Sequence, residues 1–271
     1  MPELPEVETM RAGIEPHLVG RRVVGVHIRQ PLLRWPVPVE FASNLKDQTI
    51  ESVARRAKYL LLNTRAGAVL MHLGMSGSLR VVDEMTAPQL HDHVDIVFDS
   101  RKALRLRDPR RFGALLWIAG DPQAHPLLKD LGPEPLDTEF DGDYLYRRAR
   151  GRRLSVKSFI MNSHVVAGVG NIYASEALFV AGILPARMAG RISLARYRVL
   201  AQSIKQVLER AIGYGGTTLR DFLREDGTPG FFRYELHVYG KAGQDCVHCS
   251  QPIMLRVIGQ RSSFYCAHCQ R

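Results

Sequence analysis

The sequence predicts an α+β protein that combines an N-terminal antiparallel β-sandwich, a C-terminal helical domain and a terminal β-hairpin. Three observations support this fold class. Short β-type runs separated by turn residues fill the first half of the 271-residue chain, as in antiparallel sandwiches. Helical periodicity replaces them in the second half. All four cysteines then lie between residues 246 and 269, which marks a separate terminal module.

The expected elements of the first half are one helix and a series of strands. Residues 3–19 form an amphipathic pattern that Gly20 ends. The apolar positions with helical spacing are Val7, Met10, Ile14 and Leu18. The strands expected after this helix are residues 22–28, 59–63, 68–73, 94–98, 102–107 and 114–119.

The second half begins after a linker, which we place at residues 132–143 because this stretch is rich in proline and acidic residues and has no periodicity. One long helix follows from Leu194, with a single apolar face. The glycine-dense run 213–230 is expected to form a mobile loop or a loop–helix–loop. The predicted domains are residues 1–132, 133–238 and 239–271.

The charge of the chain favours a polyanionic partner. Lys and Arg exceed Asp and Glu by 37 to 27, and the sequence pI is about 9.7, so either nucleic acid or an acidic membrane fits. No apolar run approaches the ~20 residues that cross a bilayer. The first ten residues carry three glutamates where a signal peptide would be basic and apolar. We therefore expect a cytoplasmic protein without a membrane partner.

The cysteine pattern predicts a zinc site. Cys246 and Cys249 form one C-x2-C knuckle, and Cys266 and Cys269 form a second one sixteen residues later. Two such knuckles joined by a hairpin supply four thiolates to one tetrahedral Zn²⁺. A redox dithiol and unligated thiols are the alternatives. Four sulfurs leave no open position, so the metal would be structural. His248 and His268, inside the knuckles, are then surface residues rather than ligands.

Three basic segments predict a nucleic-acid cleft. In KALRLR, residues 102–107, Arg105 and Arg107 alternate with leucines, which makes one sheet face cationic. RRARGRR, residues 147–153, adds five more arginines. DPRRFG, residues 108–113, places an aromatic beside two arginines at a turn, a combination that can wedge into a base stack and bind an unpaired base. Arginines also lie on the expected hairpin, at positions 256 and 261.

The segment HDHVD, residues 91–95, supports a different function. As a strand it places His91, His93 and Asp95 on one face, which is a plausible set of metal ligands. A metal-dependent phosphoesterase or nuclease is therefore an alternative. The simpler interpretation is the polar face of a strand.

The N-terminus offers a nucleophile. Met1 precedes Pro2, and removal of the methionine would expose a secondary amine. An α-amine titrates near pH 7.7–8.0, so its neutral fraction can attack an aldehyde-level carbon such as a sugar C1′ and form an iminium. Glu3 and Glu6 are close by as acid, base or cation stabiliser. Proline and glutamate are also ordinary first-turn residues of a helix.

Several segments together resemble one protein family. They are PELPEVE (2–8), RRAKYLLL (55–62), HLGMSGSLR (72–80), DPRRFG (108–113), GVGNIYASE (168–176) and the terminal CxxC pair. In this order, over the whole chain, they are similar to bacterial formamidopyrimidine-DNA glycosylase. The related endonuclease-VIII type begins with PEGPE, so Leu4 and the DPRRFG turn favour the formamidopyrimidine branch.

The resemblance implies a monomeric enzyme of base excision repair, in bacteria associated with the nucleoid. Its fold would be a β-sandwich, a helical domain with a helix–two-turn–helix, and a zinc hairpin. Its substrate would be double-stranded DNA with an oxidised purine (8-oxoguanine or a formamidopyrimidine) or an abasic site. Pro2 would attack C1′ of the flipped nucleotide, and Glu3 would donate the proton that opens the sugar. Lys58 would assist β-elimination and Arg261 the second, δ-elimination, which together leave a one-nucleotide gap.

The resemblance also assigns DNA-binding positions. Met75, Arg110 and Phe112 would fill the void left by the flipped base, with Arg110 reading the orphan cytosine. The positions expected to contact phosphate are His91, Arg153 and Asn171. The glycine-dense loop would close over the base. RRLSVK, residues 152–157, departs from the family, where lysines are frequent, so either Arg152 or Arg153 is the contact. A non-catalytic zinc-finger DNA-binding protein remains a further alternative.

Overall fold

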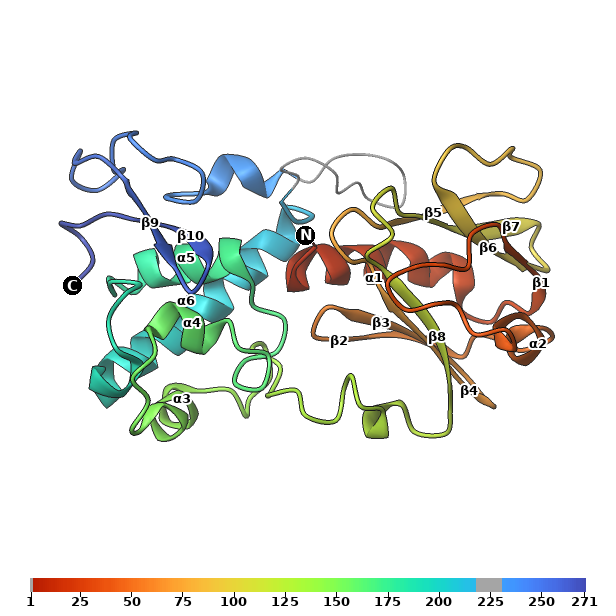
Figure 1. Ribbon diagram of the computed structural model, residues 1–271, viewed down its shortest axis with the longest axis horizontal. Helices are drawn as coiled ribbons and strands as arrows, with labels where there is room; N and C mark the ends of the chain where they lie inside the picture. Colours follow the sequence, from red (N-terminus) through yellow and green to blue (C-terminus); the bar gives the residue numbers. More distant parts are fainter. Residues whose placement is uncertain (1, 218–230) are drawn as a thin grey trace. The chain divides into compact units, whose positions relative to one another are not determined.

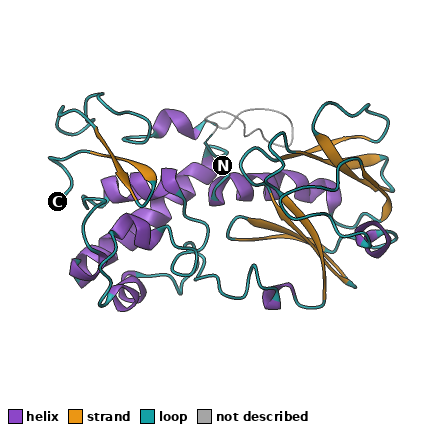
Figure 2. Cartoon of the chain, in the orientation of Figure 1, coloured by secondary structure: helices purple, strands orange, loops and turns teal. Residues whose placement is uncertain are grey.

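The computed structural model describes residues 2–217 and 231–271 of the chain (Figures 1 and 2). The chain divides into two compact units. Unit 1 comprises Met1–Lys129 and Tyr214–Arg233, and unit 2 comprises Asp130–Gly213 and Tyr234–Arg271. Unit 1 is therefore discontinuous in sequence. The break after Lys129 lies just before the predicted linker.

Unit 1 is the predicted antiparallel β-sandwich. Two four-stranded sheets, with strand orders β1-β6-β7-β5 and β2-β3-β4-β8, form from antiparallel pairs. The strands are β1 (Val23–Ile28), β2 (Ser52–Arg56), β3 (Tyr59–Thr64), β4 (Gly67–His72), β5 (Ser78–Asp83), β6 (Asp92–Phe98), β7 (Lys102–Arg107) and β8 (Ala114–Ala119). A short helix α2 (Phe41–Leu45) and a 3-10 turn η1 (Pro122–Ala124) complete it.

The predicted N-terminal helix is confirmed as α1 (Leu4–Leu18). It packs against β2, β3 and β5, and so contacts both sheets. The apolar side chains of this helix are fully buried in the core of the sandwich; they are Val7, Met10, Ile14 and Leu18. Because the helix is anchored along its whole length, its first turn is held in a fixed place in unit 1.

Unit 2 is helical, as the periodicity predicts. Its helices are α3 (Gly142–Ala149), α4 (Val156–Ile160), α5 (Asn171–Val180) and α6 (Leu194–Gly213), with a 3-10 turn η2 (Ala189–Arg191). The long helix α6 buries one face, as expected from its sequence. The predicted linker, residues 132–143, extends two residues too far, since α3 begins at Gly142. Asp141 caps this helix by accepting a hydrogen bond from the backbone N–H of Tyr144 at 2.7 Å. None of the helices in residues 2–217 and 231–271 is long and apolar enough to cross a membrane.

The cysteine segment forms the expected hairpin, with β9 (Met254–Ile258) paired to β10 (Arg261–Tyr265). A 3-10 turn η3 (Phe232–Glu235) precedes it. The hairpin shares a small core with α5, built around Phe179, Val238 and Ile253. Gln270 ties the second knuckle to the residues after α5, because its side chain donates to the carbonyl of Ile183 at 2.9 Å and accepts from the N–H of Cys266 at 2.8 Å. The cysteine module is therefore packed onto the helical unit.

Candidate functional site

The start of α1 is buried and linked to a distant segment. Pro2 and Glu3 are both buried. The backbone N–H of Glu3 donates to the Glu6 carboxylate at 2.8 Å, as in a capping box. The same carboxylate accepts from the N–H of Thr217 at 2.7 Å. Gly216, at φ +79°, approaches it so closely that a Cβ would lie 3.1 Å from the Glu6 side chain. Glu6 therefore joins the first turn of α1 to residues 216–217.

Lys58 lies in the two-residue turn between β2 and β3, beside His72 of the neighbouring β4. Tyr59 and His72 are cross-strand partners with ring centroids 4.9 Å apart. The N–H of Gly74 donates to His72 Nδ1 at 3.0 Å. Burial, and then the positive charges of Lys58 and Arg34, lower the pKa of His72 to about 4. His72 is thus a neutral imidazole beside the Lys58 ammonium at neutral pH.

A buried aspartate organises the DPRRFG turn. Asp108 is fully buried, and its carboxylate accepts from the N–H of Gly113 at 2.7 Å and from the Ser76 hydroxyl at 2.9 Å. Ser76 Oγ in turn accepts from the N–H of Arg110 at 3.2 Å. Arg111 takes a left-handed backbone conformation with φ +55°. Such a costly conformation at a well-braced turn is typical of functional sites.

The predicted void-filling residues come together on this turn and the loop beside it. Gly74 packs against the turn so closely that a Cβ there would lie 2.4 Å from the backbone carbon of Phe112. Met75 and Phe112 leave 36% and 40% of their surface exposed, so two large apolar side chains face solvent on neighbouring, closely packed segments. The Arg110 guanidinium lies over the Phe112 ring, 4.8 Å from its centroid. Together these residues form a braced, apolar and cationic tip.

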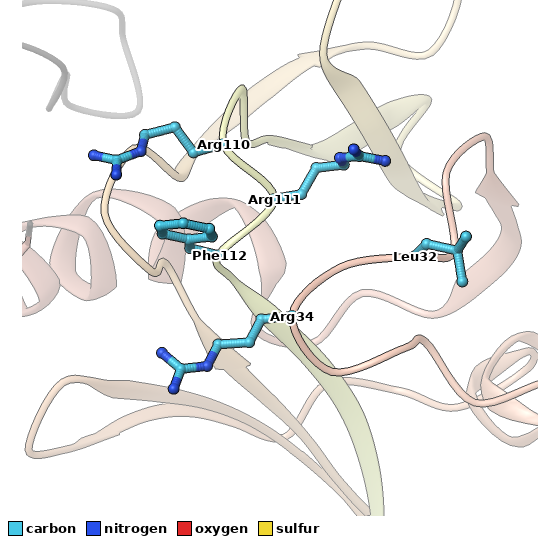
Figure 3. A pocket seen from close by; sticks show the side chains of 5 residues that line it. All are labelled: Leu32, Arg34, Arg110, Arg111 and Phe112. Atoms are coloured by element: carbon cyan, nitrogen blue, oxygen red, sulfur yellow. The ribbon is translucent and has the colours of Figure 1, made fainter.

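A pocket of about 550 Å³ adjoins this tip (Figure 3). Its lining is Leu32, Arg34, Arg110, Arg111 and Phe112. In the view of Figure 3 the Phe112 ring lies between Arg110 and Arg34. Among the described residues, no carboxylate pairs with the three guanidinium groups at this pocket.

The interpretation of HDHVD as a metal site is wrong. His91 lies before β6 with φ +74°, outside the strand. His93 Nε2 is 2.8 Å from the carbonyl oxygen of Asp108, and Asp95 is paired with Arg29 and Arg105. Only the four cysteines gather as candidate metal ligands within the described residues. Nothing in this segment therefore supports a metal-dependent nuclease.

The predicted cationic face of β7 is also wrong in part. Arg105 is only 2% exposed and binds Asp95 and two loop carbonyls, whereas Arg107 stays one-third exposed. The alternation rule failed because residues 84–88 cover this face of the sheet. Arg105 is thus a buried structural residue and not part of a DNA-facing surface.

In unit 2, the tip of the cysteine hairpin is fixed by two side chains. Lys157 Nζ donates to the carbonyl of Ser262 at 2.9 Å and to the Ser263 hydroxyl at 2.8 Å. Asn171, at the start of α5, donates its side-chain N–H to the same Ser262 carbonyl at 3.0 Å. Arg261, the residue before Ser262, is exposed. The structure therefore brings Asn171 and Arg261 close together.

The hairpin turn itself is tight. Gly259 and Gln260 have φ of +54° and +61°, as in the type I′ turns of two-residue hairpins. A Cβ on Gly259 would lie 2.6 Å from Ser158 Oγ of α4, so the turn touches that helix. Arg153 is exposed in the loop between α3 and α4, as is Arg152, and neither position is favoured over the other.

The four cysteines suit a structural metal site. Their sulfur atoms all lie within 4.8 Å of one another. The Sγ of Cys246 lies 3.8 Å from that of Cys269, and the Sγ of Cys249 lies 3.4 Å from that of Cys266. His248 and His268 are exposed, as expected, although the His248 ring stacks on Phe179 at 5.2 Å.

Sequence reasoning missed three side chains that organise these sites. They are His72, Asp108 and Lys157. Each lies inside a segment that was singled out for other residues, so the segment was found but not the role. A lysine that is 1% exposed has no signature in sequence, because burial of its ammonium depends on carbonyl acceptors 105 residues away.

Comparison with known proteins agrees with this architecture. The model of the formamidopyrimidine-DNA glycosylase N-terminal domain matches residues 1–115, and that of the glycosylase H2TH domain matches residues 131–223. Formamidopyrimidine-DNA glycosylase of Syntrophotalea carbinolica is 59% identical over 271 residues, which covers both chains completely.

Solved structures agree as well. The MutM (Fpg) protein of Thermus thermophilus superposes with a TM-score of 0.89 at 35% identity, over 99% of this chain and 98% of that one. The Lactococcus lactis Fpg in complex with DNA containing an abasic site superposes with a TM-score of 0.91 at 31% identity, over 100% of both chains. The chain therefore belongs to the formamidopyrimidine-DNA glycosylase family.

Proposed function

We propose that this protein is a bifunctional DNA glycosylase and abasic-site lyase of base excision repair that removes oxidised purines from double-stranded DNA. The observation that carries the proposal is the position of Pro2 and Glu3, buried together at the anchored start of α1, in a chain that matches a formamidopyrimidine-DNA glycosylase over its full length. The Lactococcus relative is solved with DNA containing an abasic site, which supports the same substrate class here.

The proposed reaction starts at Pro2. After loss of Met1, the lone pair of the Pro2 nitrogen forms a bond to C1′ while the glycosidic bond breaks and the oxidised base leaves with a proton. Glu3 donates a proton to the ring oxygen, the sugar opens, and the amine loses its proton to become an iminium. The iminium acidifies C2′–H, so removal of that proton near Lys58 expels the 3′ phosphate. A second elimination, served by Arg261, expels the 5′ phosphate and leaves a one-nucleotide gap.

The DNA contacts in this proposal come from both units of the chain. Met75 and Phe112 enter the space of the flipped base, and Arg110 binds the orphan cytosine. His91, Arg153 and Asn171 contact backbone phosphates. Asn171 opens α5, where backbone N–H groups favour an anion, although its own side-chain N–H already donates to the hairpin. The loop proposed to close over the base is the glycine-dense run 213–230, of which residues 218–230 lie outside the described residues.

The metal in this proposal is one Zn²⁺ with a structural role. Zn–S bonds of about 2.3 Å in a tetrahedron separate the sulfurs by roughly 3.8 Å, and two of the sulfurs lie 3.8 Å apart. Cys246, Cys249, Cys266 and Cys269 would hold it and use every coordination position. Such a closed site stabilises the hairpin that carries Arg261. We further propose a monomer that acts on nucleoid DNA in the bacterial cytoplasm.

Borohydride trapping tests the proposal directly. The processed protein, mixed with an 8-oxoguanine duplex and borohydride in the presence of EDTA, should form a covalent cross-link through the reduced iminium. Pro2→Gly keeps an α-amine and should retain some cross-linking, whereas acetylation of the N-terminal amine should abolish it. Strand cleavage without a cross-link, lost in EDTA, would indicate a metal nuclease. Binding without cleavage or cross-link would indicate a non-catalytic DNA-binding protein.

A further inference from the structure

The loop before β6, residues 84–91, stands away from the sheet that it covers. A cavity of about 630 Å³ lies between residues 84–88 of this loop and residues 26–29 of β1 and its end, with Asp95 and Arg105 in its lining. Met85 and Leu90 are 84% and 77% exposed. The loop therefore has little apolar packing beneath it, and polar contacts must hold its position.

Arg105 provides the central polar contact. Its Nε and Nη2 donate to the two carboxylate oxygens of Asp95, both at 2.8 Å. The outer edge of the same guanidinium donates to the loop carbonyls of Thr86 at 2.8 Å and Ala87 at 3.2 Å. A planar guanidinium can make these contacts at once, whereas a lysine ammonium cannot span them. Arg105 thus connects a buried carboxylate of the sheet to the backbone of the loop.

The loop ends at His91. The buried Asp92 accepts from the N–H of Gln89 at 2.8 Å, and the carbonyl of His91 accepts from the N–H of Asp108 at 3.1 Å. His91 itself has φ +74°, in the left-handed region that histidine adopts more readily than most residues. The orientation of the His91 ring therefore depends on the loop before it and on the DPRRFG turn after it.

We propose that Arg105 is a positioning residue for DNA binding: its guanidinium braces the loop 84–91 and thereby presents His91 to the DNA backbone. This inference rests on the proposed function, in which His91 contacts a phosphate. Arg105 touches no substrate and acts through the carbonyls of Thr86 and Ala87 and through the Asp92 carboxylate, which lies 3.6 Å from its Nη1.

The variant Arg105→Lys separates bracing from charge, because a lysine keeps the ion pair with Asp95 and loses the contacts to the loop. Arg29→Lys is the matched control, since Arg29 pairs with the same Asp95 carboxylate and its other hydrogen bond goes to the carbonyl of Asp92, outside the loop 84–91. Thermal unfolding of the two variants should be similar. Amide hydrogen exchange at Thr86 and Gln89, which are hydrogen-bonded in the loop, should become about tenfold faster or more in Arg105→Lys alone.

Binding of a duplex with a reduced abasic-site analogue completes the test. Arg105→Lys and His91→Ala should each weaken binding by about five- to tenfold, and the double variant should be no weaker than His91→Ala within about twofold. Additive losses, or unchanged exchange in the loop, would overturn the inference. Failure of the unaltered protein to cross-link with borohydride would instead reject the proposed function, and it would leave the exchange result standing.

Discussion

The proposed contact of Arg110 with the orphan base can be tested separately from binding of a phosphate. The Arg110 guanidinium lies 4.8 Å from the centroid of the Phe112 ring, and no other side chain among the described residues binds it, which leaves its donors available for a base. Arg110→Ala should remove a bidentate contact worth ~1–3 kcal/mol of discrimination between bases. The preference for cytosine over adenine opposite an abasic analogue should fall by about tenfold.

The control is Arg65→Ala, an exposed arginine on the β3–β4 turn of the same unit. It should leave the opposite-base preference unchanged. The measurement is equilibrium binding of duplexes with each opposite base at several salt concentrations. If Arg110→Ala alters only the salt dependence, by a slope of about one, then Arg110 holds a phosphate and does not read the base.

His72 gives a prediction for acid stability. The pKa of His72 is about 4 in the folded protein, against the ordinary histidine value of 6.5 that applies to the unfolded chain. Between pH 4 and pH 6.5 the unfolded chain therefore binds more protons than the folded protein. The stabilisation is complete above pH 6.5 and is lost as the pH falls to 4, by roughly 3 kcal/mol. His72→Asn keeps an acceptor for the Gly74 N–H and should flatten this dependence in urea unfolding from pH 7 to pH 4. An NMR titration showing an ordinary His72 pKa would contradict the assignment.

At the scale of elements, the strands that sequence reasoning missed are β2 and β5, and both are sheet edges. Edge strands carry more charge and less apolar alternation than central ones, and SVARR at residues 52–56 has only Val53 buried. The edge strands β1 and β8 were predicted because their sequences, VVGVHI and ALLWIA, are apolar runs, and the central strands and α1 were predicted because burial imposes their pattern. The burial of Arg105 could not be predicted from the alternation in β7, because residues 84–88 cover the face of the sheet on which it lies.

The packing of the loop at residues 73–77 against the DPRRFG turn leads to a prediction for Gly74. A Cβ there would lie 2.4 Å from the Phe112 backbone carbon, and φ is +59°. Gly74→Ala should cost about 2 kcal/mol or more, since strain and displacement add, and it should weaken binding of an abasic-site duplex by shifting Met75 and Phe112.

Gly120→Ala is the matched control. Its φ of +82° imposes similar strain, but nothing lies within 4 Å of the added Cβ, so only the conformational cost of roughly 1–2 kcal/mol remains. Urea unfolding and duplex binding should therefore separate the two variants. If both variants bind the duplex equally well, then the loop 73–77 and the DPRRFG turn accommodate the added Cβ without displacing Met75 and Phe112.

At the scale of the whole molecule, loss of the metal should unfold the cysteine module and leave the sandwich intact. Residues 1–245 hold no cysteine, and the small core of the module packs on α5. Cys249→Ser should abolish binding of the proposed Zn²⁺, one per chain, and expose α5 to hydrogen exchange, because metal binding supplies the folding free energy of such modules. Exchange in residues 2–129 should not change.

Val247→Ser is the control for this variant, because Val247 lies in the same knuckle and is 58% exposed. It should keep one zinc and full DNA affinity. Mass spectrometry under native conditions and hydrogen exchange provide the two readouts. A fully active Cys249→Ser protein without zinc would contradict a structural role for the metal.

The hydrogen bond between Glu6 and Thr217 has a consequence for biosynthesis. Its two partners are 211 residues apart, and they join the first turn of α1 to the second segment of unit 1. The sheets can assemble once about half of the chain has left the ribosome, because domains fold as units during synthesis. The hydrogen bond to the Glu6 carboxylate can form only after Thr217 has been translated. A nascent chain therefore carries Pro2, the proposed nucleophile, long before the contact between Glu6 and Thr217 can form in the same turn of helix α1.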